Sequence, residues 1–112
     1  MSRIKKTDVF TKWLKKLKDS IAKAHINRRI DRLERGNPGY VEPIGEGCSE
    51  MKIDYGPGYR VYYKDTGREI IIILYGGDKS TQQEDIKKSK KLAREVLLQE
   101  VSEMEEKDDE NK

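Results

Sequence analysis

The residues best suited to chemistry lie in two short segments on either side of Gly56-Pro57-Gly58. Residues 50–55 and 59–64 alternate polar and apolar side chains, which is typical of half-buried β-strands. We expect these strands to form a hairpin that pairs symmetrically about Pro57. Because side chains alternate across a sheet, one face would be apolar and pack on helices. The other would be an open polar face with Glu50, Lys52, Asp54, Arg60, Tyr62 and Lys64.

Lysine, arginine, tyrosine and a carboxylate on one face could cleave a phosphodiester without a metal. Such a reaction removes a proton from the 2′-hydroxyl, neutralises a pentavalent phosphorane and supplies a proton to the leaving oxygen. The expected register also places Asp54 opposite Arg60 and Glu50 opposite Lys64. These pairs could equally be ordinary cross-strand ion pairs, each contributing about 0.2–1 kcal/mol. The residues alone leave both interpretations open.

A second segment whose residues could bind a ligand or take part in catalysis is Gly76-Gly77-Asp78-Lys79-Ser80-Thr81. It lies between an expected strand and an expected helix, where glycine lets the backbone approach a ligand and a helix N-terminus favours anions. Lys79 would lie at the rim of the polar face. The adjacent glycines do not fit the spacing of a P-loop, so ATP binding is not expected. The alternative interpretation is a plain strand exit followed by a helix cap.

The surrounding pattern predicts an α+β fold with two N-terminal helices packed on a small antiparallel sheet, and a C-terminal helix. Phe10, Trp13, Leu14 and Leu17 have the spacing of one apolar helical face, as do Ala22, Ile26, Ile30 and Leu33. We expect a short strand at 3–6, helix caps at Asp8 and at Asp19 or Ser20, a loop over 37–49, further strands over 50–55, 59–64 and 68–75, and a last helix from near Ser80.

Composition narrows the class of protein. The chain has 112 residues, of which 40% are charged and 34% hydrophobic, which fits one small domain. One cysteine, Cys48, and one histidine, His25, exclude a disulfide framework and a Cys/His zinc site, and no cofactor is expected. No apolar run is long enough to span a membrane and the start lacks a signal peptide, so we expect a cytoplasmic protein.

Charge is divided between a basic body and an acidic tail. Residues 1–94 carry 22 basic and 13 acidic side chains, a net of +9, whereas residues 95–112 carry eight acidic side chains and two lysines, a net of −6. A basic body attracts phosphates. We expect Lys64 and the helical residues Arg28, Arg29 and Arg32 to contact an RNA backbone, although such helix faces are usually only solvated.

Several of these segments together resemble a known family. They are Phe10–Leu17 with Trp13, Met51–Tyr63 with its Gly-Pro-Gly-Tyr-Arg-Val-Tyr-Tyr run, and Leu74–Gln82 with Gly-Gly-Asp-Lys-Ser-Thr-Gln, followed by Asp85-Ile86. They resemble the addiction-module killer proteins, type II toxins of the RelE/ParE superfamily, in the HigB-like branch. The resemblance covers about residues 3–95. The expected division is therefore a toxin domain over 1–95 and a helical extension over 96–112 that ends in a disordered acidic tail.

The resemblance implies a function and partners. Many members cleave mRNA in the ribosomal A site without a metal, and a cognate antitoxin, often a helix-turn-helix repressor, neutralises them. Contact with DNA would then be indirect, through the antitoxin. The ParE-like alternative is a toxin that poisons DNA gyrase and cleaves no RNA.

The resemblance also implies roles for the residues of the polar face. Lys52, Arg60 and Lys79 match the basic set by strand position, and Asp54 and Tyr62 are the nearest groups for proton transfer. We expect Arg60 and Lys79 to neutralise the scissile phosphate and Lys52 or Asp54 to take the 2′-hydroxyl proton. Tyr62 would stack on a base or position the phosphate.

Overall fold

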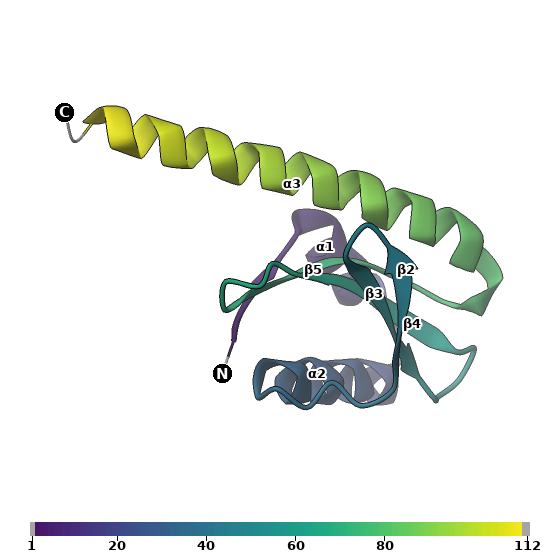
Figure 1. Ribbon diagram of the computed structural model, residues 1–112. Helices are drawn as coiled ribbons and strands as arrows, with labels where there is room; N and C mark the ends of the chain where they lie inside the picture. Colours follow the sequence, from purple (N-terminus) through teal and green to yellow (C-terminus); the bar gives the residue numbers. More distant parts are fainter. Residues whose placement is uncertain (1, 111–112) are drawn as a thin grey trace.

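The computed structural model describes residues 2–110, with side chains described as far as Leu97. In this part of the chain five strands form one sheet in the order β1-β5-β4-β3-β2 (Figure 1). The strands are β1 (Arg3–Lys6), β2 (Val41–Gly45), β3 (Cys48–Ile53), β4 (Tyr59–Asp65) and β5 (Ile70–Gly77). The helices are α1 (Asp8–Lys16), α2 (Ser20–Glu34), the 3-10 turn η1 (Lys79–Thr81) and α3 (Gln82–Glu110).

The sheet is mixed, which corrects the expectation of a purely antiparallel one. β1 pairs in parallel with β5, whereas β2, β3, β4 and β5 pair antiparallel in succession. β2 also lies within the expected loop over 37–49. Its glycines and Pro43 resemble loop residues, yet an edge strand tolerates a proline that a central strand does not.

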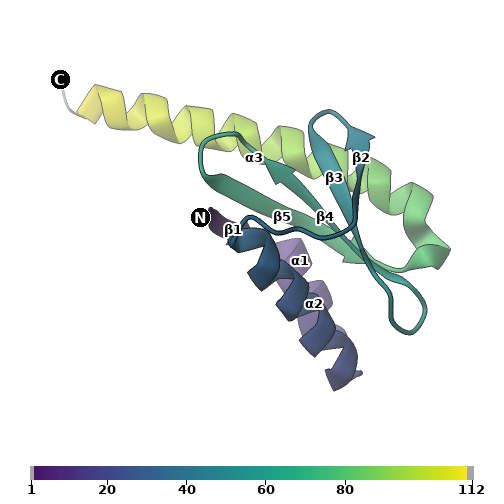
Figure 2. The ribbon, with the colours of Figure 1, turned by 60° about the horizontal axis from the view of Figure 1, so that its bottom comes forward.

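Helices α1 and α2 pack on one face of the sheet (Figure 2). The expected apolar face of α2 is confirmed, because Ala22, Ile26, Ile30 and Leu33 are all buried. Asp19 caps α2 by accepting hydrogen bonds from the backbone N–H of Ile21 and Ala22. At α1 the cap is Thr7 rather than Asp8: its hydroxyl oxygen accepts from Phe10 N at 3.0 Å and its O–H donates to Leu74 O at 2.7 Å. That second bond ties the start of α1 to β5.

Helix α3 covers the other face of the sheet, so the helix arrangement differs from the expected one. A second core forms there, in which Ala93 packs with Cys48, Ile72 and Leu74. A β-bulge near Leu74 helps, because it lets both Leu74 and Tyr75 pack on the α3 side. The polar hairpin face, expected to be open, is therefore partly roofed by a helix.

Helix α3 extends through most of the residues expected to form the acidic tail. The apolar spacing of Val96, Leu97, Val101 and Met104 also predicts one face of this helix, but the side chains of Val101 and Met104, and residues 111–112, lie outside the described part of the chain. Of the helices that the structure describes, none has the length and apolar character needed to cross a membrane.

The β3–β4 hairpin has a different register from the expected one. Ile53 pairs with Tyr59 and Lys52 with Arg60, so residues 54–58 form a five-residue connection centred on Gly56. Because the shift is by two residues, the side chains that stay in the ladder keep their expected faces. The predicted opposition of Asp54 with Arg60 is wrong: Asp54 leaves the ladder and Lys52 takes its place. Glu50 likewise lies opposite Tyr62 rather than Lys64.

Candidate functional site

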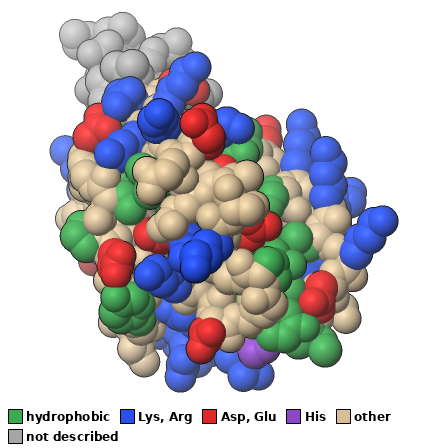
Figure 3. Space-filling model, turned by 90° about the vertical axis from the view of Figure 1, so that its right-hand side faces the viewer, with side chains coloured by type: hydrophobic (Ala, Val, Ile, Leu, Met, Phe, Trp, Pro, Cys, Tyr) green, Lys and Arg blue, Asp and Glu red, His purple; other side chains and the backbone are tan. Residues whose placement is uncertain are grey.

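A pocket of about 400 Å³ opens beside the hairpin tip, between α2 and the ends of β3 and β4. We call it the cationic pocket. It is lined by Arg29, Tyr40, Lys52, Ile53, Asp54, Gly58, Tyr59 and Arg60. Figure 3 shows this end of the molecule, where lysine and arginine side chains lie at the centre of the face with acidic groups nearby.

Arg60 is held rigidly at the edge of this pocket. Its side chain is only 9% exposed, and Nε lies 2.6 Å from Oε1 of the buried Glu50, an ion pair rather than an aligned hydrogen bond. Its Nη1 donates to Gly58 O at 2.8 Å. Gln82, in the first turn of α3, donates from Nε2 to the same Glu50 oxygen at 2.8 Å. Glu50 therefore connects Arg60 to α3 and fixes the direction of the Arg60 guanidinium.

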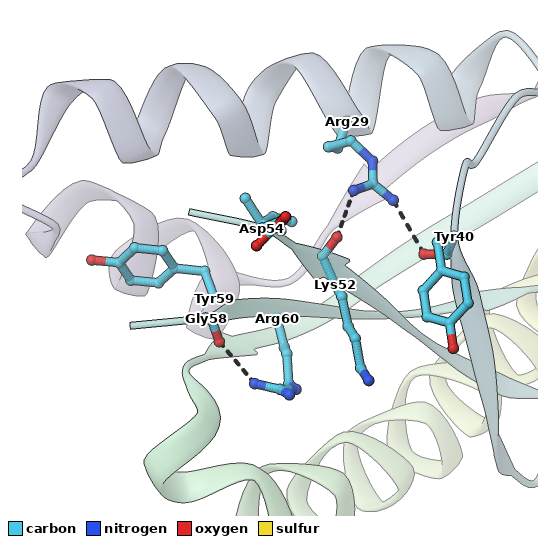
Figure 4. Close-up of a pocket in the computed structure, with 8 residues that line it drawn as sticks. Arg29, Tyr40, Lys52, Asp54, Gly58, Tyr59 and Arg60 are labelled. Carbon is cyan, nitrogen blue, oxygen red and sulfur yellow. Dashed lines mark hydrogen bonds between the residues drawn. The ribbon is translucent and has the colours of Figure 1, made fainter. Parts of the chain in front are cut away.

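Lys52 lies directly opposite Arg60 on the neighbouring strand. Figure 4 shows the two side chains extending side by side in the same direction. Lys52 is half-exposed, with Nζ 3.9 Å from Glu42 Oε1 and 5.7 Å from the centre of the Tyr40 ring. These contacts are loose, so Lys52 keeps a mobile charge that can turn toward an anion.

Lys79, at the start of η1 just after β5, lies near the same end of the hairpin. A Cβ added at Gly58 would lie 3.5 Å from Arg60 Nη1 and 3.7 Å from Lys79 Cβ, so the two residues flank one glycine. Asp78 sets the turn by accepting from Ser80 N at 2.8 Å, and Lys79 is exposed. The structure thus brings Lys52, Arg60 and Lys79 around one end of the hairpin.

The hairpin tip is anchored to the start of α2. The Tyr55 hydroxyl donates to Asp19 Oδ2 at 2.9 Å, and the Tyr55 ring packs on His25 with centroids 4.8 Å apart. The backbone hydrogen bond to Asp19 from Ala22 and the bond from Tyr55 lower the pKa of Asp19. This anchor positions Asp54, which is exposed and lines the cationic pocket.

Arg29 has a structural role that the sequence did not indicate. Its guanidinium donates to three backbone carbonyls, those of Lys52, Pro38 at 3.0 Å and Tyr40 at 3.2 Å. Burial lowers its pKa. Arg29 therefore ties α2 to β3 and to the segment before β2, whereas Arg28 and Arg32 on the same helix are exposed.

Tyr62 and Lys64 do not join the cationic pocket. Tyr62 is fully buried, its hydroxyl has no hydrogen-bond partner, and burial raises its pKa. A buried ring offers no face on which an RNA base could stack. Lys64 lies four residues along β4 from Arg60, about 13 Å away at the rise of a strand, and donates to Glu46 O at 2.6 Å.

Glu50 and Gln82 are the site residues that sequence reasoning missed. Glu50 was expected to pair with a neighbouring lysine on an open surface, but it is 2% exposed. Gln82 follows the Gly-Gly-Asp-Lys-Ser-Thr run, and nothing in its spacing indicates that α3 folds back over β3. The only sequence signal for Glu50 was its place beside basic residues on the polar face, which it shares with Asp54.

Fold and site define a small α+β protein with a five-stranded mixed sheet and a preorganised cationic pocket at one hairpin end. The chain belongs to the Gp49-like phage-derived protein family (DUF891), whose model matches residues 12–98. This family is associated with the toxins of toxin–antitoxin systems.

One curated relative is similar over nearly its whole length. It is a protein of Haemophilus influenzae described as uncharacterised, 51% identical over 96 residues, which cover 86% of this chain and 97% of that protein. No solved structure gives a significant match.

Proposed function

We propose that this protein is the toxin of a type II toxin–antitoxin system, of the RelE-like kind and its HigB-like branch, and that it cleaves mRNA on the ribosome without a metal. The observation that supports the proposal is the set of three cations around Gly58. Arg60 is fixed by Glu50, Lys52 lies opposite it and Lys79 flanks it. Positively charged side chains held in fixed positions stabilise the negative charge of the phosphorane that forms during phosphodiester cleavage.

The roles follow from this placement. Arg60 and Lys79 neutralise the scissile phosphate, because they flank the same glycine. Lys52 or Asp54 takes the proton of the 2′-hydroxyl, since both line the cationic pocket. Tyr62 has no direct contact with RNA in this proposal, because its ring is buried under α3.

The rest of the RNA would follow the basic surface. Arg28 and Arg32 present exposed guanidiniums on α2, next to the wall of the cationic pocket that Arg29 forms. Contacts of this type bind any sequence and weaken with salt. A cognate antitoxin, a helix-turn-helix DNA-binding protein in our proposal, would neutralise the toxin in the cytoplasm.

The test is inducible expression with Lys79→Ala or Lys52→Gln, scored by growth arrest and by mapping new RNA 5′ ends. Both side chains are at least partly exposed, so the fold should persist, and cleavage should fall by about 100-fold or more. Arg68→Ala is the matched control: Arg68 is exposed in the turn between β4 and β5, at the opposite end of both strands.

Two results would overturn the proposal. The first is full growth arrest and RNA cleavage by both variants. The second is a wild-type protein that produces no new 5′ ends but lowers DNA supercoiling, which would indicate a gyrase inhibitor instead.

A further inference from the structure

A second pocket of about 400 Å³ lies beyond the cationic pocket, between α1, the end of β5 and the first turns of α3. We call it the aromatic pocket. Three part-exposed rings line it, those of Trp13, Tyr59 and Tyr75. Trp13 and Tyr59 also pack against one core and Tyr75 against the other, yet each ring stays partly exposed at this pocket.

Two glycines make room for this pocket. A Cβ added at Gly76 would fall within the Trp13 ring, so the indole lies directly against the strand. The Trp13 and Tyr59 rings meet edge-on, with centroids 6.2 Å apart and planes at 68°. Lys88 places its Nζ 5.7 Å from the centre of the Tyr75 ring. The walls are therefore aromatic, with one cation at the rim.

The floor and the opposite rim carry carboxylates. Asp85 is buried against Gly77, accepts from Thr81 Oγ1 at 2.6 Å and has its pKa raised by burial. Asp78 accepts hydrogen bonds from the backbone N–H and the hydroxyl of Ser80. Glu84 is exposed at the rim. An ionised carboxylate only accepts hydrogen bonds, so Glu84 would favour a ligand edge that donates them.

The two pockets are neighbours. Tyr59 lines both, and Figure 4 shows its ring pointing away from Lys52 and Arg60. Asp78, in the aromatic pocket, directly precedes Lys79, which flanks the cationic pocket. A nucleotide whose phosphate lies at Arg60 could therefore extend its base past Tyr59 into the aromatic pocket.

We propose that the aromatic pocket binds the base next to the scissile phosphate and prefers bases with an exocyclic amino group over uracil. Proteins read single-stranded RNA by stacking its bases on aromatic rings and by hydrogen bonds to their edges. The proposal rests on the proposed nuclease function and adds the residues that would select the cleaved sequence.

The test uses the fluorescence of Trp13, because the chain contains a single tryptophan. The full-length protein is titrated with 3′-CMP, 3′-AMP, 3′-GMP and 3′-UMP, and with inorganic phosphate alone. We expect the three amino-bearing nucleotides to change the emission at concentrations several-fold lower than 3′-UMP, and phosphate to leave it unchanged.

Two variants identify the contacts. Tyr75→Leu removes one stacking wall and should weaken nucleotide binding by about tenfold. Glu84→Gln replaces an acceptor by an amide that also donates, so it should narrow the preference for amino-bearing bases in both binding and cleavage-site mapping. Glu84 is exposed, so this variant should fold even if Tyr75→Leu does not. Glu95→Gln, on the same helix but outside the pocket, should behave as wild type.

The outcomes separate this inference from the nuclease proposal. Cleavage with no nucleotide-dependent change in Trp13 emission, and an unaltered cleavage preference in Glu84→Gln, would overturn the base site alone. Nucleotide-dependent quenching without any RNA cleavage would support the base site and overturn the nuclease. If arginine methyl ester changes the emission more strongly than any nucleotide, the pocket binds a cationic side chain of a protein partner and the base site is wrong.

Discussion

At the scale of single residues, the buried carboxylate of Glu50 determines what the cationic pocket can do. It lies between Arg60 on β4 and Gln82 on α3, with only 2% of its surface exposed. Taking a carboxylate out of water is costly unless it is paired, so Glu50 and Arg60 depend on each other. Their pairing keeps the guanidinium directed toward Gly58 instead of leaving it free to rotate in solvent.

Glu50→Gln should therefore destabilise the fold by about 3–5 kcal/mol, because it leaves the charge of Arg60 buried and unpaired. The double variant Glu50→Gln/Arg60→Met should recover much of that loss yet remain inactive, since it removes both charges together. Urea unfolding measures the stability and RNA end mapping measures the activity.

The double variant is also the control that separates folding from function. A stable but inactive double variant assigns Arg60 a role beyond packing. If Glu50→Gln alone unfolds at the same urea concentration as wild type, the ion pair does not hold the site together.

At the scale of elements, the cap of α2 also anchors the β3–β4 hairpin. Asp19 accepts from the first backbone N–H groups of α2 and from the Tyr55 hydroxyl at 2.9 Å. Two elements 36 residues apart in the chain therefore share one carboxylate, and the five-residue tip that carries Asp54 and Gly58 depends on it.

This shared carboxylate predicts an acid-sensitive contribution to stability. The hydrogen bonds lower the pKa of Asp19 below its ordinary 3.8 in the folded state. A lowered carboxylate pKa means that its stabilisation is fully present above that ordinary value and is lost as the pH falls through the lowered one. Asp19→Ala should thus lower the melting temperature at neutral pH but have little effect at the acid end, as thermal melts across pH 2–7 would show.

Tyr55→Phe is the matched variant for this contact, because it keeps the ring on His25 and removes only the hydroxyl. It should lose part of the same pH-dependent stability. A constant difference between Asp19→Ala and wild type down to the lowest pH would mean that the ionised carboxylate is not what caps α2.

At the scale of the whole molecule, the cationic pocket and the acidic C-terminal residues lie at opposite ends of α3. The cationic pocket is at the start of α3, whereas the acidic residues follow α3 away from the sheet (Figure 1). A helix of 29 residues is about 43 Å long at a rise of about 1.5 Å per residue. In the proposed function, the acidic segment would therefore lower the long-range attraction of the basic body for RNA without blocking the pocket.

Removing residues 99–112 should accordingly increase RNA affinity at low salt by a few-fold and leave the cleavage sites unchanged. The gain should disappear above about 0.5 M salt, where the Debye length falls to a few ångströms. Fluorescence anisotropy with a labelled RNA would measure it. Equal affinity for both chains at low salt would exclude this electrostatic effect, and loss of folding in the truncated chain would contradict the division into a domain over 1–95 and an extension.

The sequence by itself determined the local features of this protein. Alternation in residues 50–55 and 59–64 predicted two strands and the correct face for the side chains that stay in the ladder. The spacing of Ala22, Ile26, Ile30 and Leu33 predicted the buried side of α2. Capping, turn formation and apolar periodicity act over a few residues, so they can be recognised in one short segment. The grouping of Lys52 with Arg60 followed from the same periodicity.

Only the tertiary structure determined the hairpin register, the packing of α3 over the sheet and the contact partners of the site residues. Tyr55 lies outside the ladder and its hydroxyl donates to Asp19. The hairpin register is shifted by two residues from the expected one, so Lys52, not Asp54, lies opposite Arg60. Helix α3 folds over β3 and β4, which buries Tyr62 and connects Gln82 to Glu50. These contacts join segments 32 and 36 residues apart, and their strength depends on the burial that the complete fold creates. No local pattern carries that information.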